Sequence, residues 1–171
     1  MSRFNLTKQY YSSNYQNVHF LVISTELPLI GTGSAQYNFA SNDLGKASSN
    51  QNINGIIVYY HKTAYSTTSK VPPYAKFREI YHPLFDKYRV DHVLQGHEHT
   101  YQSSYHMRYN VNNSFNQVTD NANSHNYTNP QGRIFTIVGT AGAPSISIVW
   151  TLSLHCYSVY RTWLSGCDYD K

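Results

Sequence analysis

Short apolar runs rich in β-branched residues alternate with helical patterns along the chain, and this alternation constrains the fold more than any other feature. Four runs are typical of buried strands, at residues 18–25, 55–60, 91–95 and 133–138. Helical patterns separate the first three of them. Strands that alternate with helices build layered α/β domains, so an all-β sandwich is disfavoured. A length of 171 residues is enough for one such domain.

Two helices are expected between these strands. The first follows Ser34, a residue type that caps helices, and covers residues 35 to about 46. The second is clearer, because apolar residues recur at spacings of three and four over residues 74–88. The prolines at 72–73 suit its first turn. Pro83 lies inside the pattern and predicts a kink or break there.

The second half of the chain is less regular. Residues 101–109 alternate loosely and predict another strand, whereas residues 110–131 are rich in Asn, Ser and Thr and predict a long surface loop or hairpin. Residues 134–160 contain no Asp, Glu, Lys or Arg and are long enough to span a bilayer. Glycine, proline and many hydroxyl side chains in that stretch favour two buried strands and a loop instead.

Composition excludes several classes of protein. The net charge is +4, from 13 basic and 9 acidic residues, and the absence of any basic run argues against a nucleic-acid or membrane partner. An aromatic content of 15% argues against a charge-driven disordered chain. Two cysteines exclude a disulfide-rich framework.

Sequons at Asn5, Asn112 and Asn126 favour a secreted or extracytoplasmic location weakly, without a signal peptide in the chain. The oligomeric state stays open.

Three histidines are placed to bind metal. His97 and His99 belong to a Gly-His-Glu-His motif directly after the strand at 91–95, and His61 directly follows the strand at 55–60. Ligands of open α/β sheets bind beyond the carboxyl ends of the strands. Neutral imidazole is the commonest protein ligand for zinc, iron and related metals. The sequence therefore predicts three imidazoles at one edge of one sheet, and the other six histidines are interpreted as ordinary hydrogen-bonding groups.

Five blocks of the sequence, in order, resemble the metallophosphoesterase superfamily (the calcineurin-like phosphoesterases), and most of all its purple acid phosphatase branch. They are YYSSNYQNVHFL at 10–21, GSAQYNFASNDL at 33–44, IIVYYHKTAYS at 56–66, YHPLFDKYRVDHVLQGHEHTYQ at 81–102 and GRIFTIVGTAGA at 132–143. The resemblance implies the second half only of a layered metallophosphoesterase-like α/β sandwich, with histidine ligands at the carboxyl ends of strands.

The resemblance also implies a dinuclear metal site. His61 and His97 match ligands of one metal, and His99 matches a ligand of the other. The ions would be two divalent or trivalent metals (Fe, Zn or Mn), incompletely liganded in this chain. Tyr101 matches an aromatic residue that packs beside the ligands, although a strand tyrosine facing the core is an equal alternative. In such sites two cations activate a water and hold a phosphate ester for hydrolysis.

The departures from the family pattern are large. The DxH, GDxxD and GNHE motifs, which supply the carboxylates and other ligands of the first half, are absent. Thr63 replaces a proline, and Gln102 replaces an acidic residue. We therefore expect residues 1–144 to form a partial catalytic domain and residues 145–171 to form an unmatched tail.

Three functions are consistent with the sequence. The leading hypothesis is metal-dependent hydrolysis of phosphate esters, as in acid phosphatases, with this chain holding the histidine half of the site and inactive alone. The alternative is a noncatalytic binding or surface module derived from a phosphoesterase. The weakest is a mononuclear three-histidine hydrolase with an open position for water.

Overall fold

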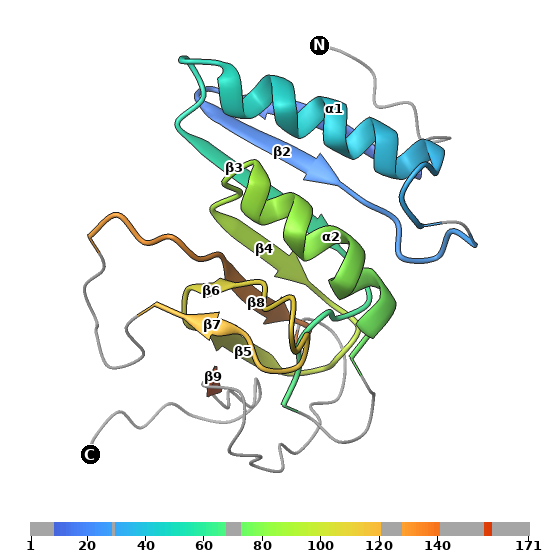
Figure 1. Ribbon diagram of the computed structural model, residues 1–171, viewed down its shortest axis with the longest axis vertical. Helices are drawn as coiled ribbons and strands as arrows, with labels where there is room; N and C mark the ends of the chain where they lie inside the picture. Colours follow the sequence, from blue (N-terminus) through green and yellow to red (C-terminus); the bar gives the residue numbers. More distant parts are fainter. Residues whose placement is uncertain (1–8, 29, 68–72, 121–127, 141–155, 159–171) are drawn as a thin grey trace.

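The computed structural model describes residues 9–28, 30–67, 73–120, 128–140 and 156–158. They form a mixed α/β fold with a central seven-stranded sheet, two helices and a small two-stranded sheet (Figure 1). The central strands are, in their order across the sheet, β1 (Tyr11–Tyr15), β2 (Val18–Val22), β3 (Gly55–Tyr60), β4 (His92–Gln95), β8 (Ile134–Val138), β5 (Tyr101–Ser104) and β9 (Cys156–Ser158).

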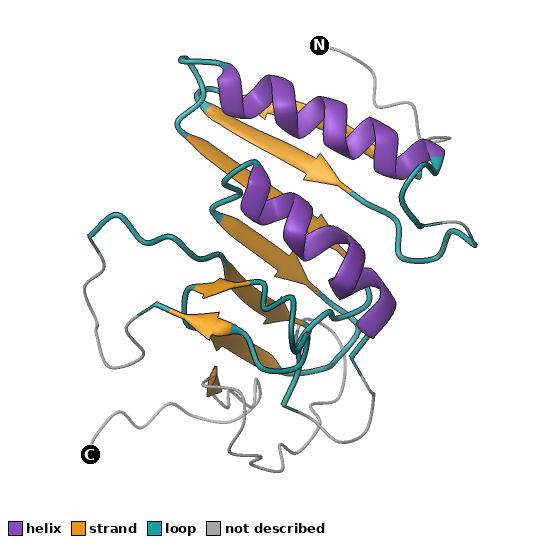
Figure 2. Cartoon of the chain, viewed as in Figure 1, coloured by secondary structure: helices purple, strands orange, loops and turns teal. Residues whose placement is uncertain are grey.

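The centre of the sheet is parallel. β2 pairs with β3, β3 with β4, and β4 with β8, all in parallel register, whereas β1, β5 and β9 add antiparallel edges. Each parallel pair needs a crossover connection. Helix α1 (Ala35–Ser49) supplies the crossover from β2 to β3, and α2 (Ala75–Lys87) supplies the one from β3 to β4. Both helices lie over the same face of the sheet (Figure 2). The predicted α/β layering is confirmed.

Helix α1 begins where the sequence predicts. The Ser34 hydroxyl accepts a hydrogen bond from the backbone N–H of Tyr37 at 3.2 Å. The helix extends three residues beyond the predicted end, to Ser49. Its buried side chains include Ala40 and Leu44, which are fully buried in the core.

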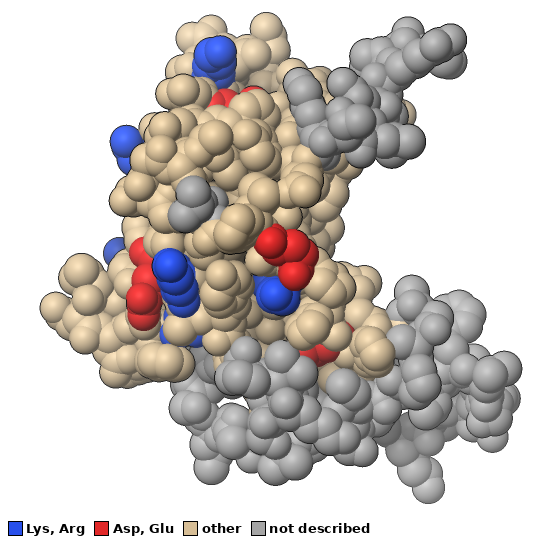
Figure 3. Space-filling view, turned by 90° about the vertical axis from the view of Figure 1, so that its right-hand side faces the viewer, with Lys and Arg blue, Asp and Glu red and all other residues tan. Residues whose placement is uncertain are grey.

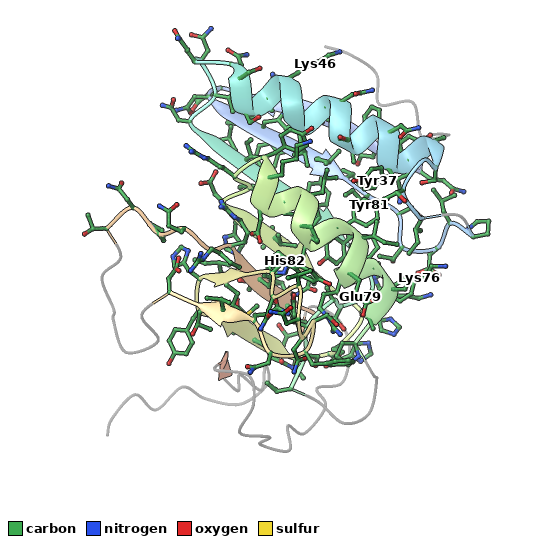
Figure 4. The ribbon with its side chains drawn as sticks, in the orientation of Figure 1. Tyr37, Lys46, Lys76, Glu79, Tyr81 and His82 are labelled. Carbon is green, nitrogen blue, oxygen red and sulfur yellow. The ribbon has the colours of Figure 1, made fainter. Side chains whose placement is uncertain are left out.

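Helix α2 begins later than predicted, and the predicted break at Pro83 does not occur. It begins at Ala75 after Tyr74, so Pro73 precedes the helix, and it continues past Pro83 to Lys87 without a break. An internal proline costs about 3 kcal/mol because it removes a backbone hydrogen bond. Tertiary packing outweighs that cost, since the helix buries one continuous face on the sheet. That face includes Phe77, Arg78, Tyr81, His82, Leu84 and Phe85, whereas Lys76 and Glu79 lie on the exposed side (Figure 4).

The predicted strand at 101–109 is divided. β5 ends at Ser104, and β6 (Met107–Arg108) leaves the central sheet to pair with β7 (Val118–Thr119). Met107 still exchanges both backbone hydrogen bonds with Arg133, at 2.8 and 2.7 Å. Residues 110–120 therefore belong to a hairpin excursion, one of the two forms expected, and residues 121–127 lie outside the described residues.

The core lies between the sheet and the two helices. Burial alternates along β2 and β3, where Leu21 and Val58 are fully buried. The aromatic rings of Phe77 and Tyr81 stack with centroids 4.3 Å apart, and Phe77 also contacts Tyr60 at 4.5 Å. This aromatic cluster fixes α2 over β3.

No helix within the described residues is long and apolar enough to cross a membrane. Positive and negative side chains are sparse and intermixed on the face drawn in Figure 3, and its described part carries no continuous basic patch. Most of the segment at 134–160 and nearly all of the expected tail at 145–171 lie outside the described residues, apart from β8 at one end and β9 near the other.

A carboxylate joins α2 to the β6–β8 region. Asp86 accepts hydrogen bonds from the backbone N–H of Tyr109 at 2.7 Å and from Arg133 Nε at 3.3 Å, and it lies 3.4 Å from His82 Nε2. Burial raises the pKa of Asp86, but the hydrogen bonds and the charges of His82 and Arg133 outweigh burial, so the pKa lies below its ordinary value of 3.8.

Stability should therefore fall in acid through Asp86. A carboxyl with a lowered native pKa stabilises the fold above its ordinary pKa, and this stabilisation is lost as the pH falls through the native value. We expect Asp86→Asn to lower the free energy of unfolding at pH 7 by about 1–3 kcal/mol. The deficit should shrink below pH 4 in urea unfolding series. Glu79→Gln, on the exposed side of α2, is the control. A deficit that stays constant from pH 7 to pH 3 would contradict this role.

Candidate metal centre

The sheet brings His61 and His97 together. His61 directly follows β3, His97 lies two residues beyond β4, and the final residues of these parallel strands, Tyr60 and Gln95, are register partners. The Gly96 N–H donates to the His61 carbonyl at 3.0 Å, which joins the two loops at their base. The imidazoles meet at the carboxyl edge of the sheet, with His61 Nε2 and His97 Nδ1 3.1 Å apart.

The two nitrogens are hydrogen-bonded to each other at 3.1 Å, and one metal ion could span a similar separation. Zinc–imidazole bonds are about 2.0–2.1 Å long, so two ligands of a tetrahedral ion have nitrogens about 3.3 Å apart. The observed separation of 3.1 Å is close to that value, and the rings cross at 79° rather than stacking. His61 is exposed and His97 is half-buried, so a cation can reach the pair from solvent.

The backbone around His97 is shaped for this contact. His97 has a φ of +65°, a left-handed conformation that a non-glycine residue adopts only when its surroundings fix it. Gly96 is also confined, because a Cβ there would lie 3.3 Å from His61 Nδ1. A larger residue at 96 would push against the His61 ring. The glycine of the motif therefore makes room for His61.

His99 and Tyr101 lie close in sequence but are less clearly placed. His99 is half-buried, and within the described residues no group of three His, Cys, Asp or Glu side chains converges on one point. The described part of the chain thus gives no support to the mononuclear three-histidine site. The assignment of His99 to a second metal stays a prediction. Tyr101 is 38% exposed, so the alternative in which it faces the core is wrong.

An ion pair at the same edge was missed by the sequence interpretation. Glu26, four residues beyond β2, accepts from Lys62 Nζ at 3.0 Å. The hydrogen bond from Lys62 is the largest cause of the lowered pKa of Glu26, and the charge of His61 contributes in the same direction. Glu26 belongs to no motif with a metal-ligand spacing, and only the register of β2 on β3 reveals its proximity.

A buried polar network lies behind the histidines and was also missed. Glu98 is fully buried, and its carboxylate accepts from Thr63 Oγ1 at 3.2 Å and from Ser66 Oγ at 2.5 Å. Gln102 accepts from both the N–H and the hydroxyl of Thr67, at 2.9 and 3.1 Å. The sequence signal for this network was a charged residue, Glu98, between two candidate ligands. The Gly-His-x-His motif sets no requirement at that position, so the sequence interpretation gave Glu98 no role.

Similarity to known proteins agrees with this architecture. The solved purple acid phosphatase PPD1 from yellow lupin (Lupinus luteus) seeds superposes with a TM-score of 0.72 and 26% identity, over 94% of this chain and 27% of that one. This chain is metallophosphoesterase-like. An Arabidopsis thaliana protein named probable inactive purple acid phosphatase 27 is 30% identical over 144 residues, 81% of this chain and 22% of that protein.

A second purple acid phosphatase-like relative supports the same assignment. The protein named probable inactive purple acid phosphatase 9 of Arabidopsis thaliana is 34% identical over 96 residues, 54% of this chain and 14% of that protein. No family model matches the chain. The chain spans less than a quarter of the length of these curated relatives. The predicted resemblance and fold class are thus confirmed.

Proposed function

We propose that this chain supplies the histidine half of a metal site for the hydrolysis of phosphate esters. The observation that carries the proposal is the 3.1 Å approach of His61 Nε2 and His97 Nδ1 at the carboxyl ends of adjacent parallel strands. Likeness to purple acid phosphatases supports phosphate esters as the substrate class. In the completed site, with the ligands that this chain lacks, His99 would bind a second metal, and Tyr101 would pack beside the ligands.

The chain's own residues do three things in this scheme. His61 and His97 present neutral nitrogen donors, and the Gly96–His61 backbone hydrogen bond holds their loops together. Lys62 is a cation beside His61, and Glu26 balances its charge. Metals of such sites supply a nucleophile at neutral pH and screen the charge of the ester. Residues of this chain would hold and orient the cation, and within the described residues no group of three or more His, Cys, Asp or Glu side chains converges to complete a site.

The isolated chain should bind one metal ion and hydrolyse phosphate esters poorly. We expect calorimetric titration with Zn²⁺ or Mn²⁺ to show one site, with affinity at least tenfold weaker in His61→Ala and in His97→Ala because each variant loses one of two ligands. His92→Gln, at the opposite end of β4, is the matched control and should bind as the parent does.

Hydrolysis of p-nitrophenyl phosphate with Mn²⁺, Zn²⁺ or Fe³⁺ should stay at background. Robust turnover that disappears in His97→Ala would contradict the expected inactivity. Titrations without any site that depends on His61 or His97 would contradict the metal function, and they would favour the noncatalytic binding module. The names of the two Arabidopsis thaliana relatives, both called probable inactive, are the observation that keeps this second function in consideration.

The cellular location, the macromolecular partners and the division of the chain are proposed from the sequence. Asn112 is exposed in the turn between β6 and β7, as an acceptor of an N-linked glycan must be, whereas Asn5 and Asn126 lie outside the described residues. An extracytoplasmic location, and the absence of nucleic-acid and membrane partners, rest on the sequence alone. The division into residues 1–144 and 145–171 is likewise a prediction.

A further inference from the structure

Two loops carry the histidines, and buried polar side chains join these loops beneath the rings. The loop at 61–67 follows β3, and the segment at 96–100 follows β4. Besides the Gly96–His61 backbone bond, the Gln95 side-chain oxygen accepts from the Ala64 N–H at 2.6 Å. Glu98 is fully buried and accepts hydrogen bonds from Thr63 and Ser66 of the loop at 61–67. The relative position of the two loops is therefore fixed by side chains as well as by strand pairing.

Glu98 is placed unusually for a carboxylate. It is fully buried, and its carboxylate accepts hydrogen bonds from the Thr63 and Ser66 hydroxyls. Burial of a carboxylate is costly unless its oxygens are hydrogen-bonded. The hydrogen bonds from the Thr63 and Ser66 hydroxyls therefore help to keep the Glu98 carboxylate inside. In this way the side chain ties the loop at 61–67 to the backbone between His97 and His99.

We propose that Glu98 is a positioning residue that holds the His61 and His97 imidazoles in their metal-binding arrangement. Its neighbours in the chain, His97 and His99, are half-buried while Glu98 is fully buried, so the inward Glu98 side chain sets the rotation of the backbone that carries both rings. The left-handed φ of His97, +65°, needs such an external constraint. The expected effect of Glu98 on metal binding rests on the proposed metal function, whereas the contacts of Glu98 do not depend on it.

Two neighbouring side chains support the same role. Thr63 has a hydroxyl that donates to Glu98. The Gln102 Nε2 lies 3.5 Å from Ser66 Oγ and donates to Thr100 Oγ1 at 2.9 Å. A carboxylate at 102 could not donate, and it would place a second negative charge beside Glu98. The residues at 63, 98 and 102 are thus mutually compatible.

The test compares Glu98→Ala, Glu98→Gln and the parent chain, first without metal. We expect a nuclear Overhauser contact between the His61 and His97 rings in the parent, its loss in Glu98→Ala, and its retention in Glu98→Gln, because the amide keeps one oxygen as an acceptor for the hydroxyls. Zn²⁺ titration should then give an affinity about 10–100-fold weaker in Glu98→Ala, with partial recovery in Glu98→Gln.

Thr136→Val is the matched control, since it removes a buried hydroxyl that bonds His92 and Ser103 instead of the two loops. It should leave the ring contact and the Zn²⁺ affinity unchanged. If Glu98→Ala does not fold, Thr63→Val and Ser66→Ala decide the question, because each removes one hydrogen bond to the carboxylate. Folded variants that keep the ring contact would overturn the positioning role. A parent chain that shows the ring contact but binds no Zn²⁺ would overturn the metal function and leave the positioning role standing.

Discussion

Replacing Gly139 with alanine is expected to lower the free energy of unfolding by about 3 kcal/mol or more, because among the described glycines an added Cβ here makes the shortest contact. Gly139 directly follows β8, and its N–H donates to the Thr100 carbonyl at 3.0 Å. A Cβ at this position would overlap the backbone carbonyl of Glu98. Backbone cannot move aside as a flexible side chain can, so the turn that carries His97 must shift.

The measurement is urea unfolding followed by circular dichroism, together with the Zn²⁺ titration. Gly139→Ala should lose stability and metal affinity together, because the displaced backbone belongs to the Gly-His-Glu-His motif. Gly31→Ala is the matched control, since a Cβ at residue 31 meets nothing within 4 Å. Its stability should stay within about 0.5 kcal/mol of the parent. Equal stabilities for the two variants would show that the contact between Gly139 and Glu98 is wrong.

Phe77→Ala should cost about 3–5 kcal/mol, the usual range for removal of a buried phenylalanine ring. Phe77 is fully buried, stacks on Tyr81 with centroids 4.3 Å apart, and contacts Tyr60 at 4.5 Å. The loss combines the transfer of the ring to water with the cavity left between α2 and β3. Since Tyr60 directly precedes His61, the cavity also loosens the support of the metal centre.

The midpoint of urea unfolding should fall while the dependence on urea concentration stays unchanged, as for a change in stability alone. Val111→Ala provides the comparison, because Val111 is 82% exposed and its truncation should change stability by less than about 0.5 kcal/mol. A Phe77→Ala variant as stable as Val111→Ala would show that α2 does not pack on β3 as described.

Sequence patterns predicted the elements whose signals are local. β3 has the predicted bounds, and β2, β4 and β8 match within a few residues, because short β-branched runs between polar segments have few other solutions. The Ser34 cap was predictable for the same reason. The meeting of His61 and His97 also followed from sequence, since both residues follow strands that a crossover helix makes parallel neighbours.

Non-local packing decided the rest. Helix α2 continues past Pro83 because it buries one face on the sheet. Helix propensity does not include the stabilisation from that burial, so the sequence could not predict that the helix continues. The division of residues 101–109 depends on the pairing of Met107 with Arg133, two segments far apart in sequence. The Glu98 network needs hydroxyls from another loop, so the sequence showed Thr63 only as a departure from the family pattern.

The parallel order of the central strands has a consequence for how the histidine pair comes into being. His61 and His97 are 36 residues apart, and they meet only when β3 and β4 have paired through the α2 crossover. Pairing over this separation carries the entropy cost of closing the connecting loop, which the folded sheet has already met. We therefore expect a cation that binds the pair to stabilise the completed sheet, and to act mainly on the unfolding rate if the pair is not yet formed in the folding transition state.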